Sequence, residues 1–128
     1  MKWLKAKVLP VAVAALWIGF SEFLRNEFLL KRFWTEHYKS LGLDFPSGPV
    51  NGAVWMLWSL VFAIVISVFL RKFTFIQAAF LAWITGFVMM WMVIYNLGVL
   101  PAGIFYLAIP LSLLEAFIAA LILRETGN

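Results

Sequence analysis

Long runs of apolar residues dominate this chain, and the clearest of them lies in its second half. Residues 73–123 contain a single charged residue, Glu115, among aliphatic and aromatic side chains. This run is long enough to cross a bilayer twice, because one membrane-spanning helix needs about 20 apolar residues. Since open sheet edges would leave polar backbone groups unpaired in lipid, the pattern predicts helices.

Across the whole chain the apolar runs predict four membrane-spanning helices, at about residues 8–30, 51–70, 75–97 and 103–123. The connections around Arg71 and Pro101 are short, so neighbouring helices are expected to be antiparallel. We therefore predict an all-α membrane protein, in which residues 1–128 form a single transmembrane domain built as an antiparallel four-helix bundle.

The connection between the first and second spans is longer and has two parts. A helix over residues 31–42 would carry charged residues on one face and apolar or aromatic residues on the other, the latter being Phe33, Trp34, His37, Tyr38 and Leu41. This amphipathic pattern predicts a short helix that lies in the membrane interface. The segment from Asp44 to Pro49 is rich in turn-forming residues and predicts a loop.

Composition and charge agree with a membrane protein. Hydrophobic residues make up 65% of the chain and charged residues 12%, against about 45–50% and about 25% in soluble domains. The net charge of +4 does not indicate nucleic-acid binding, because the Lys and Arg residues border the apolar runs. That placement is typical of topology signals and of contacts with lipid headgroups. Membrane lipids are the predicted partners, and cysteine chemistry is excluded because the chain has none.

The basic residues also predict an orientation. If the N-terminus is cytoplasmic, that side carries Lys2, Lys5, Lys7, Arg71, Lys72 and Arg124. The other side then carries Arg25, Lys31, Arg32 and Lys39, all in the long connection. The larger number of Lys and Arg residues on the side of the termini favours a multi-pass protein of the bacterial inner membrane with both termini in the cytoplasm. Insertion in both orientations, as an antiparallel dimer, stays open.

Two acids inside the spans are the main candidates for a functional site. Glu22 shares a helical face with Gly19, and Glu115 shares one with Ser112. Small residues let helices approach closely, so both acids are expected to face the bundle interior. Arg25, one turn away, is a possible partner for Glu22, whereas Glu115 has no obvious cation.

Further polar residues complete the predicted site. A rise of about 1.5 Å per residue places Glu22 near Ser59 of the second span and Glu115 near Thr85 of the third. Asn96 lies on the same face as Thr85, at the helix end. These five residues are the candidates for binding a solute or a proton. Three states of Glu115 are open: protonated, hydrogen-bonded to a group such as Thr85, or facing a watery cavity. The competing interpretation is that Glu115 is a neutral acid that ties two helices together.

No metal site, catalytic residue or cofactor is predicted. His37 is the single histidine, and its spacing to Glu27, Glu36 and Asp44 matches no metal-ligand pattern.

The run from Phe33-Trp34 to Leu41-Gly42-Leu43, between a first helix and a proline-containing loop, resembles small four-helix bacterial integral membrane proteins of uncharacterised families. The resemblance covers most of the chain as a layout; it implies a four-helix fold and no activity. The chain is also similar in size and helix count to small multidrug transporters, but Glu22 stands near the end of its helix and their other motifs are not evident. Fluoride channels share four helices and a phenylalanine-rich interior, but their Gly-rich, Arg-containing signature is missing.

Transport of a small solute, or proton-coupled transport, is the favoured function. Four helices filled with large aromatic side chains leave little room for a pore in one copy, so transport would require a homo-oligomer. The alternative is a structural or accessory protein that binds lipid or another membrane protein. A lipid-modifying enzyme that uses Glu22, Glu36 and His37 comes third, because no nucleophile or phosphate-binding loop accompanies them.

Overall fold

The computed structural model describes the backbone of residues 2–127 and the side chains of residues 8–125. Within that part four helical stretches are long and apolar enough to cross a membrane, namely Val8–Leu29, Pro49–Phe69, Phe75–Asn96 and Ala102–Glu125. The prediction of a helical chain with four long apolar segments is therefore confirmed. The side chains of Lys2, Lys5 and Lys7, used in the orientation argument, lie outside the described residues.

Several of these stretches are divided into shorter elements. The first consists of α1 (Lys2–Phe23) and the π-helical segment η1 (Leu24–Leu29), and the second is α3 (Pro49–Phe69). Between them lies α2 (Lys31–Ser40). The third consists of α4 (Phe75–Trp83), the π-helical segment η2 (Ile84–Val88) and α5 (Met89–Asn96). The fourth consists of the short 3-10 segment η3 (Ala102–Ile104) and α6 (Phe105–Gly127).

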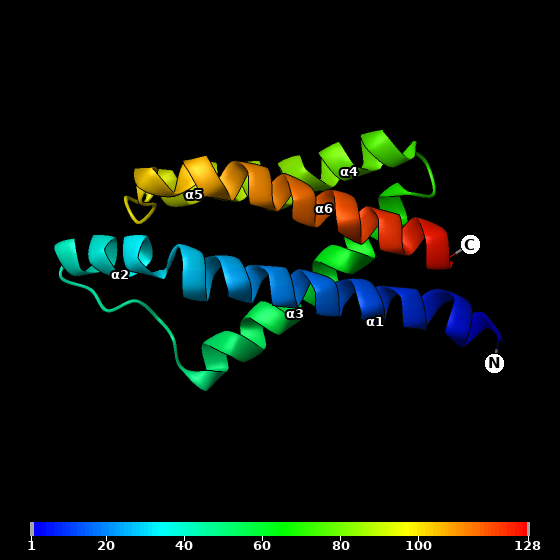
Figure 1. Ribbon diagram of the computed structural model, residues 1–128, viewed down its shortest axis with the longest axis horizontal. Coiled ribbons are helices and arrows are strands. Elements are labelled where there is room, and N and C mark those ends of the chain that lie inside the picture. Colours follow the sequence, from blue (N-terminus) through cyan, green and yellow to red (C-terminus); the bar gives the residue numbers. More distant parts are fainter. Residues whose placement is uncertain (1, 128) are drawn as a thin grey trace.

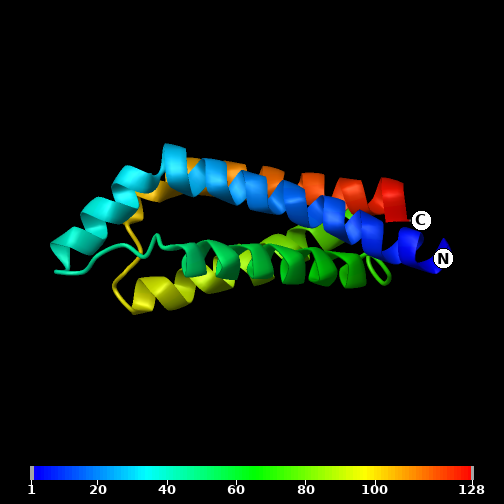
Figure 2. The ribbon, with the colours of Figure 1, turned by 90° about the horizontal axis from the view of Figure 1, so that it is seen from below.

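The chain passes along the long axis of the molecule four times and reverses at each connection (Figure 1). Both termini lie at one end, which we call the termini end; α2 and the connection after it lie at the other, the loop end. Seen from below, α1 and α6 form one layer and α3 with α4 and α5 forms the other (Figure 2). Within and between these layers α1 packs against α6 and α3, and α4 packs against α6.

Alanines make up most of the main core between the two layers, and a few larger side chains pack among them. The buried members are Ala14, Ala15, Ile18, Phe62, Ala63, Ile66, Ala79, Ala82, Phe87, Ala116, Ala119, Ala120 and Leu123. Large apolar side chains such as Leu16, Phe20 and Met92 are instead exposed on the outside. Because lipid tails are as apolar as these side chains, helices in a membrane pack through small residues and leave large ones outside. The distribution therefore suits a membrane protein.

The π-helical segment η2 brings an aromatic ring into the interior. Phe87 is 1% exposed, and its ring centroid lies 5.6 Å from that of Phe62 on α3. Phe62 in turn covers Gly86, where a Cβ atom would stand 2.5 Å from the Phe62 ring. Glycine at position 86 is thus what allows α3 and η2 to pack this closely.

Two contacts fix α2 at the loop end. The side chains of Phe33 and Trp34 pack against a buried group formed by Leu100, Ile104 and neighbouring residues. On the same helix, the His37 Nε2 atom lies 2.9 Å from the backbone oxygen of Gly98, in the turn after α5. This second contact joins the long connection to the turn before α6.

Candidate functional site

The site begins with a buried ion pair at the end of the first helical stretch. Arg25 Nη2 lies 2.7 Å from Glu22 Oε1, and the two side chains are 6% and 5% exposed. Asn26 holds the other Glu22 oxygen, because its Nδ2 donates to Glu22 Oε2 at 3.0 Å. Positions i, i+3 and i+4 of a helix share a face, so the sequence itself places these three side chains together. The ion pair between Glu22 and Arg25 is the one expected from the sequence.

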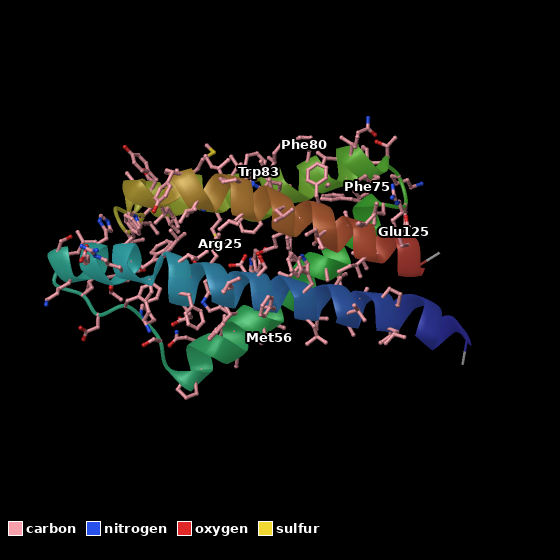
Figure 3. The ribbon with its side chains drawn as sticks, viewed as in Figure 1. Arg25, Met56, Phe75, Phe80, Trp83 and Glu125 are labelled. Carbon is pink, nitrogen blue, oxygen red and sulfur yellow. The ribbon has the colours of Figure 1, made fainter. Side chains whose placement is uncertain are left out.

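Arg25 is inside the helix and inside the protein, which corrects its assignment to the long connection. The segment η1 continues the helix past it, and the Leu30 backbone N–H donates to the Arg25 oxygen at 2.8 Å. That five-residue spacing is the π-helical pattern, which appears mostly as single turns inserted in α-helices. Arg25 is 5% exposed, and its side chain points from η1 toward α6 (Figure 3).

Glu115 is the second acid of the site, and the expectation that it has no cation is wrong. Its side chain is 0% exposed, and Arg25 Nη1 donates to Glu115 Oε1 at 3.2 Å. The backbone of the same residue is also held, because Trp17 Nε1 donates to the Glu115 carbonyl oxygen at 3.0 Å. One guanidinium group therefore joins two acids on different helices. We call Glu22, Arg25 and Glu115 the acid–arginine cluster.

The cluster contains two acidic groups and one basic group, and all three side chains are buried. Its single cation, Arg25, also lies over the Phe87 ring, with the guanidinium carbon 5.2 Å from the ring centroid. The Oε2 atom of Glu115 is buried and has no hydrogen-bond partner among the described residues. Because an uncompensated charge is costly in such surroundings, one proton or one further cation is needed to balance the two carboxyl groups.

Two cavities at the loop end reach the cluster. The inner cavity, of about 310 Å³, is lined by Glu22 and Arg25 together with α2, the loop after it, α5 and the start of the fourth stretch. The side cavity, of about 480 Å³, lies between α1 and the start of α3 and is also lined by Glu22. Both are lined by Asn26, Glu27, Pro46, Asn51 and Trp55. Glu22 thus lines both cavities and Arg25 lines the inner one, whereas Glu115 lines neither and contacts Arg25.

The other predicted site residues lie in different places. Ser59 is buried and lines the side cavity, where its hydroxyl donates to the Trp55 backbone oxygen at 2.9 Å. Thr85 is exposed and its hydroxyl donates within its own helix, to the Leu81 oxygen at 2.9 Å. Asn96 is exposed at the end of α5. The structure therefore brings Ser59 close to Glu22, and it does not bring Thr85 or Asn96 to the acid–arginine cluster.

The polar groups of α2 form contacts of their own. Glu36 Oε1 accepts from Arg32 Nε at 3.0 Å on the exposed face. Among the described residues no group of three or more His, Cys, Asp or Glu side chains is placed to hold a metal ion. The cavities therefore place open space beside carboxyl, guanidinium and amide groups, which are groups able to form hydrogen bonds and ion pairs.

Comparison with known proteins indicates no family for this chain. No family model matches it, and neither the curated proteins nor the solved structures contain a significant match.

Proposed function

We propose that the protein is a small-solute transporter that couples solute binding to proton binding and works as a homo-oligomer. One observation carries the proposal: Glu22 and Arg25 line a cavity at the loop end, and Glu115, which contacts Arg25, is fully buried. An ionisable group inside a membrane segment is by default a candidate for such a role. Here two acids share one cation, so the cluster can take up and release a proton while the helices stay packed.

In this proposal the four apolar stretches cross the membrane as an antiparallel bundle and α2 lies in the interface at the loop end. The charged face of α2 supports that placement, because Lys31, Arg32 and Lys39 are exposed there. The excess of basic residues near the termini end supports cytoplasmic termini. The loop end, with its cavities, then faces the opposite side of the membrane.

Oligomerisation supplies the path that one copy lacks. The core between the layers is filled by side chains, and Glu115 is 0% exposed. A solute that enters the inner cavity therefore cannot pass beyond Arg25 within one copy of the chain. A second copy with its own cavity would provide surfaces along which the solute can leave.

The test is proton movement in proteoliposomes that contain a pH-sensitive dye. Three probe solutes, tetramethylammonium, benzenesulfonate and glucose, are added outside in turn, and the internal pH is followed. We expect one class of probe to move protons in the wild type, Glu115→Gln to abolish this movement, and Glu36→Gln to retain it. Proton movement by Glu115→Gln at the wild-type rate, or no movement with any probe, would refute the proposal.

A second function, that of an accessory protein held together by the cluster, is favoured by the complete burial of Glu115. In that case the cluster ties α1 to α6 and the partner is a lipid or another membrane protein. The same proteoliposomes distinguish the two functions, because an accessory protein moves no protons with any probe. Crosslinking in native membranes would then recover one partner in fixed proportion to this chain.

A further inference from the structure

We propose that the inner cavity binds a small organic cation, that is, an ammonium group carried on a compact apolar body. This inference rests on the proposed function, because it names the solute class of the same site. Its first support is the balance of charge in the acid–arginine cluster and at the two cavities beside it; Glu22 and Glu27 line both cavities, whereas Glu115 lines neither and contacts Arg25. Glu22, Glu27 and Glu115 are opposed by Arg25 and Lys31, with Lys31 Nζ 3.1 Å from Glu27 Oε2. One positive charge is lacking, and a bound ammonium group supplies it.

The second support is the aromatic lining of the cavity. Its rings belong to Trp34, Tyr38, Phe45, Trp55, Phe87 and Trp91. Three of them form a group, with ring centroids 5.1 Å apart for Tyr38 and Phe45 and 5.8 Å apart for Trp34 and Phe45. The faces of such rings attract cations within about 6 Å. Arg25, which lies over the Phe87 ring, already makes this contact from the floor of the cavity.

The lining disfavours an anion. The Arg25 nitrogens Nη1 and Nη2 already contact Glu115 and Glu22 respectively, so an anion beside the guanidinium group would share it with two carboxyl groups that repel an anion when ionised.

The lining also disfavours a lipid tail. Glu22, Arg25, Asn26 and Asn51 all line the cavity, and hydrocarbon packed over such groups would leave them without water. A volume of about 310 Å³ falls at the lower end of the range of small-molecule pockets, which runs from about 300 to about 1,000 Å³. The occupant is therefore a compact solute with a polar group.

The experiment measures binding to the full chain in nanodiscs of zwitterionic lipid, with empty nanodiscs as the blank for partition into lipid. Three probes of similar shape are compared: benzyltrimethylammonium, its neutral carbon isostere neopentylbenzene, and the anion benzenesulfonate. We expect saturable binding of the cation, roughly tenfold or more tighter than that of either other probe. Glu22→Gln should weaken cation binding by about tenfold, whereas the exposed and matched Glu36→Gln should leave it unchanged.

Two variants that each replace an aromatic residue keep the test valid if Glu22→Gln does not fold. Trp55 lines both cavities, so Trp55→Leu should weaken cation binding several-fold. Tyr95, which is 70% exposed and lines neither cavity, provides the matched control Tyr95→Leu. Equal effects of these two variants would show that the cavity is not the binding site.

The other outcomes separate this inference from the proposed function. Three results would overturn the inference. Equal binding of the neutral isostere would identify an apolar or lipid pocket, and tighter binding of benzenesulfonate would identify an anion site. No saturable binding of any probe would show that the cavity binds none of these solutes. Cation binding without proton movement in proteoliposomes would support the ligand class and refute transport. Proton movement driven by benzenesulfonate or glucose alone would support transport and refute the ligand class.

Discussion

Arg25 and Glu115 stand 90 positions apart in the chain and are joined by a hydrogen bond of 3.2 Å. This bond connects the π-helical end of the first stretch to the buried face of α6. Since Arg25 also pairs with Glu22 at the floor of the inner cavity, the same side chain contributes to helix packing and to the charge of the candidate site.

Removal of Arg25 should strongly destabilise the fold. Arg25→Met leaves two buried carboxyl groups without their cation, and breaking a buried pair in this way costs about 3–5 kcal/mol. The free energy of unfolding can be measured by titration with a denaturing detergent in mixed micelles. Arg32→Met is the matched control, because Arg32 is 85% exposed and exposed pairs contribute at most about 1 kcal/mol.

The loss of stability caused by Arg25→Met should be smaller when Glu22 and Glu115 are neutralised as well. In Arg25→Met/Glu22→Gln/Glu115→Gln no carboxylate is left unpaired, so part of the stability should return. If the triple variant is less stable than Arg25→Met alone, the carboxyl groups are not what destabilises the single variant.

Gly86→Ala should disturb the contact between α3 and η2. The added Cβ would meet the Phe62 ring at 2.5 Å, and overpacking of this kind typically costs about 1–3 kcal/mol. The matched control is Gly52→Ala in α3, since a Cβ at position 52 meets nothing within 4 Å. Both variants can be compared by the same detergent titration, and equal stability of the two would show that the tight packing at Gly86 is not required.

The hydrogen bond from Trp83 Nε1 to Ser112 Oγ, 2.9 Å long, should hold α4 against α6. A double-mutant cycle of Trp83→Phe and Ser112→Ala should give a coupling of about 0.5–1.5 kcal/mol, and values near 0.6 kcal/mol are typical between membrane helices. A second cycle of Trp83→Phe and Ser59→Ala gives the control. Both serine hydroxyls donate within their own helices, but of the two only Ser112 accepts from Trp83 among the described contacts. A coupling as large with Ser59→Ala as with Ser112→Ala would contradict the assignment.

The helical layout was predictable from the sequence because it depends on local pattern. Long apolar runs specify membrane-length helices, and the breaks at Arg71 and Pro101 coincide with turns in the structure. The pair of Glu22 and Arg25 was also predictable, since a spacing of three residues places both on one helical face.

The link from Arg25 to Glu115 was not predictable in the same way. It depends on the π-helical segment η1, which keeps Arg25 within the helix, and on the packing of α1 against α6. Neither leaves a signal in the spacing of residues. The inward position of Phe87 depends likewise on η2 and on close packing at Gly86. The predicted contact between Thr85 and Glu115 is not formed. The Thr85 hydroxyl donates instead to a backbone oxygen of its own helix.

The central claim, that the acid–arginine cluster exchanges a proton for a bound solute, is tested most directly by counting protons. Benzyltrimethylammonium is added to the purified protein in weakly buffered detergent solution, and released protons and bound probe are measured together. We predict release of about one proton per bound cation in the wild type, because the cluster has one carboxyl group more than it has cations. The same binding should release no proton in Glu115→Gln. Cation binding with no proton release in the wild type, or equal release in Glu115→Gln, would contradict the account.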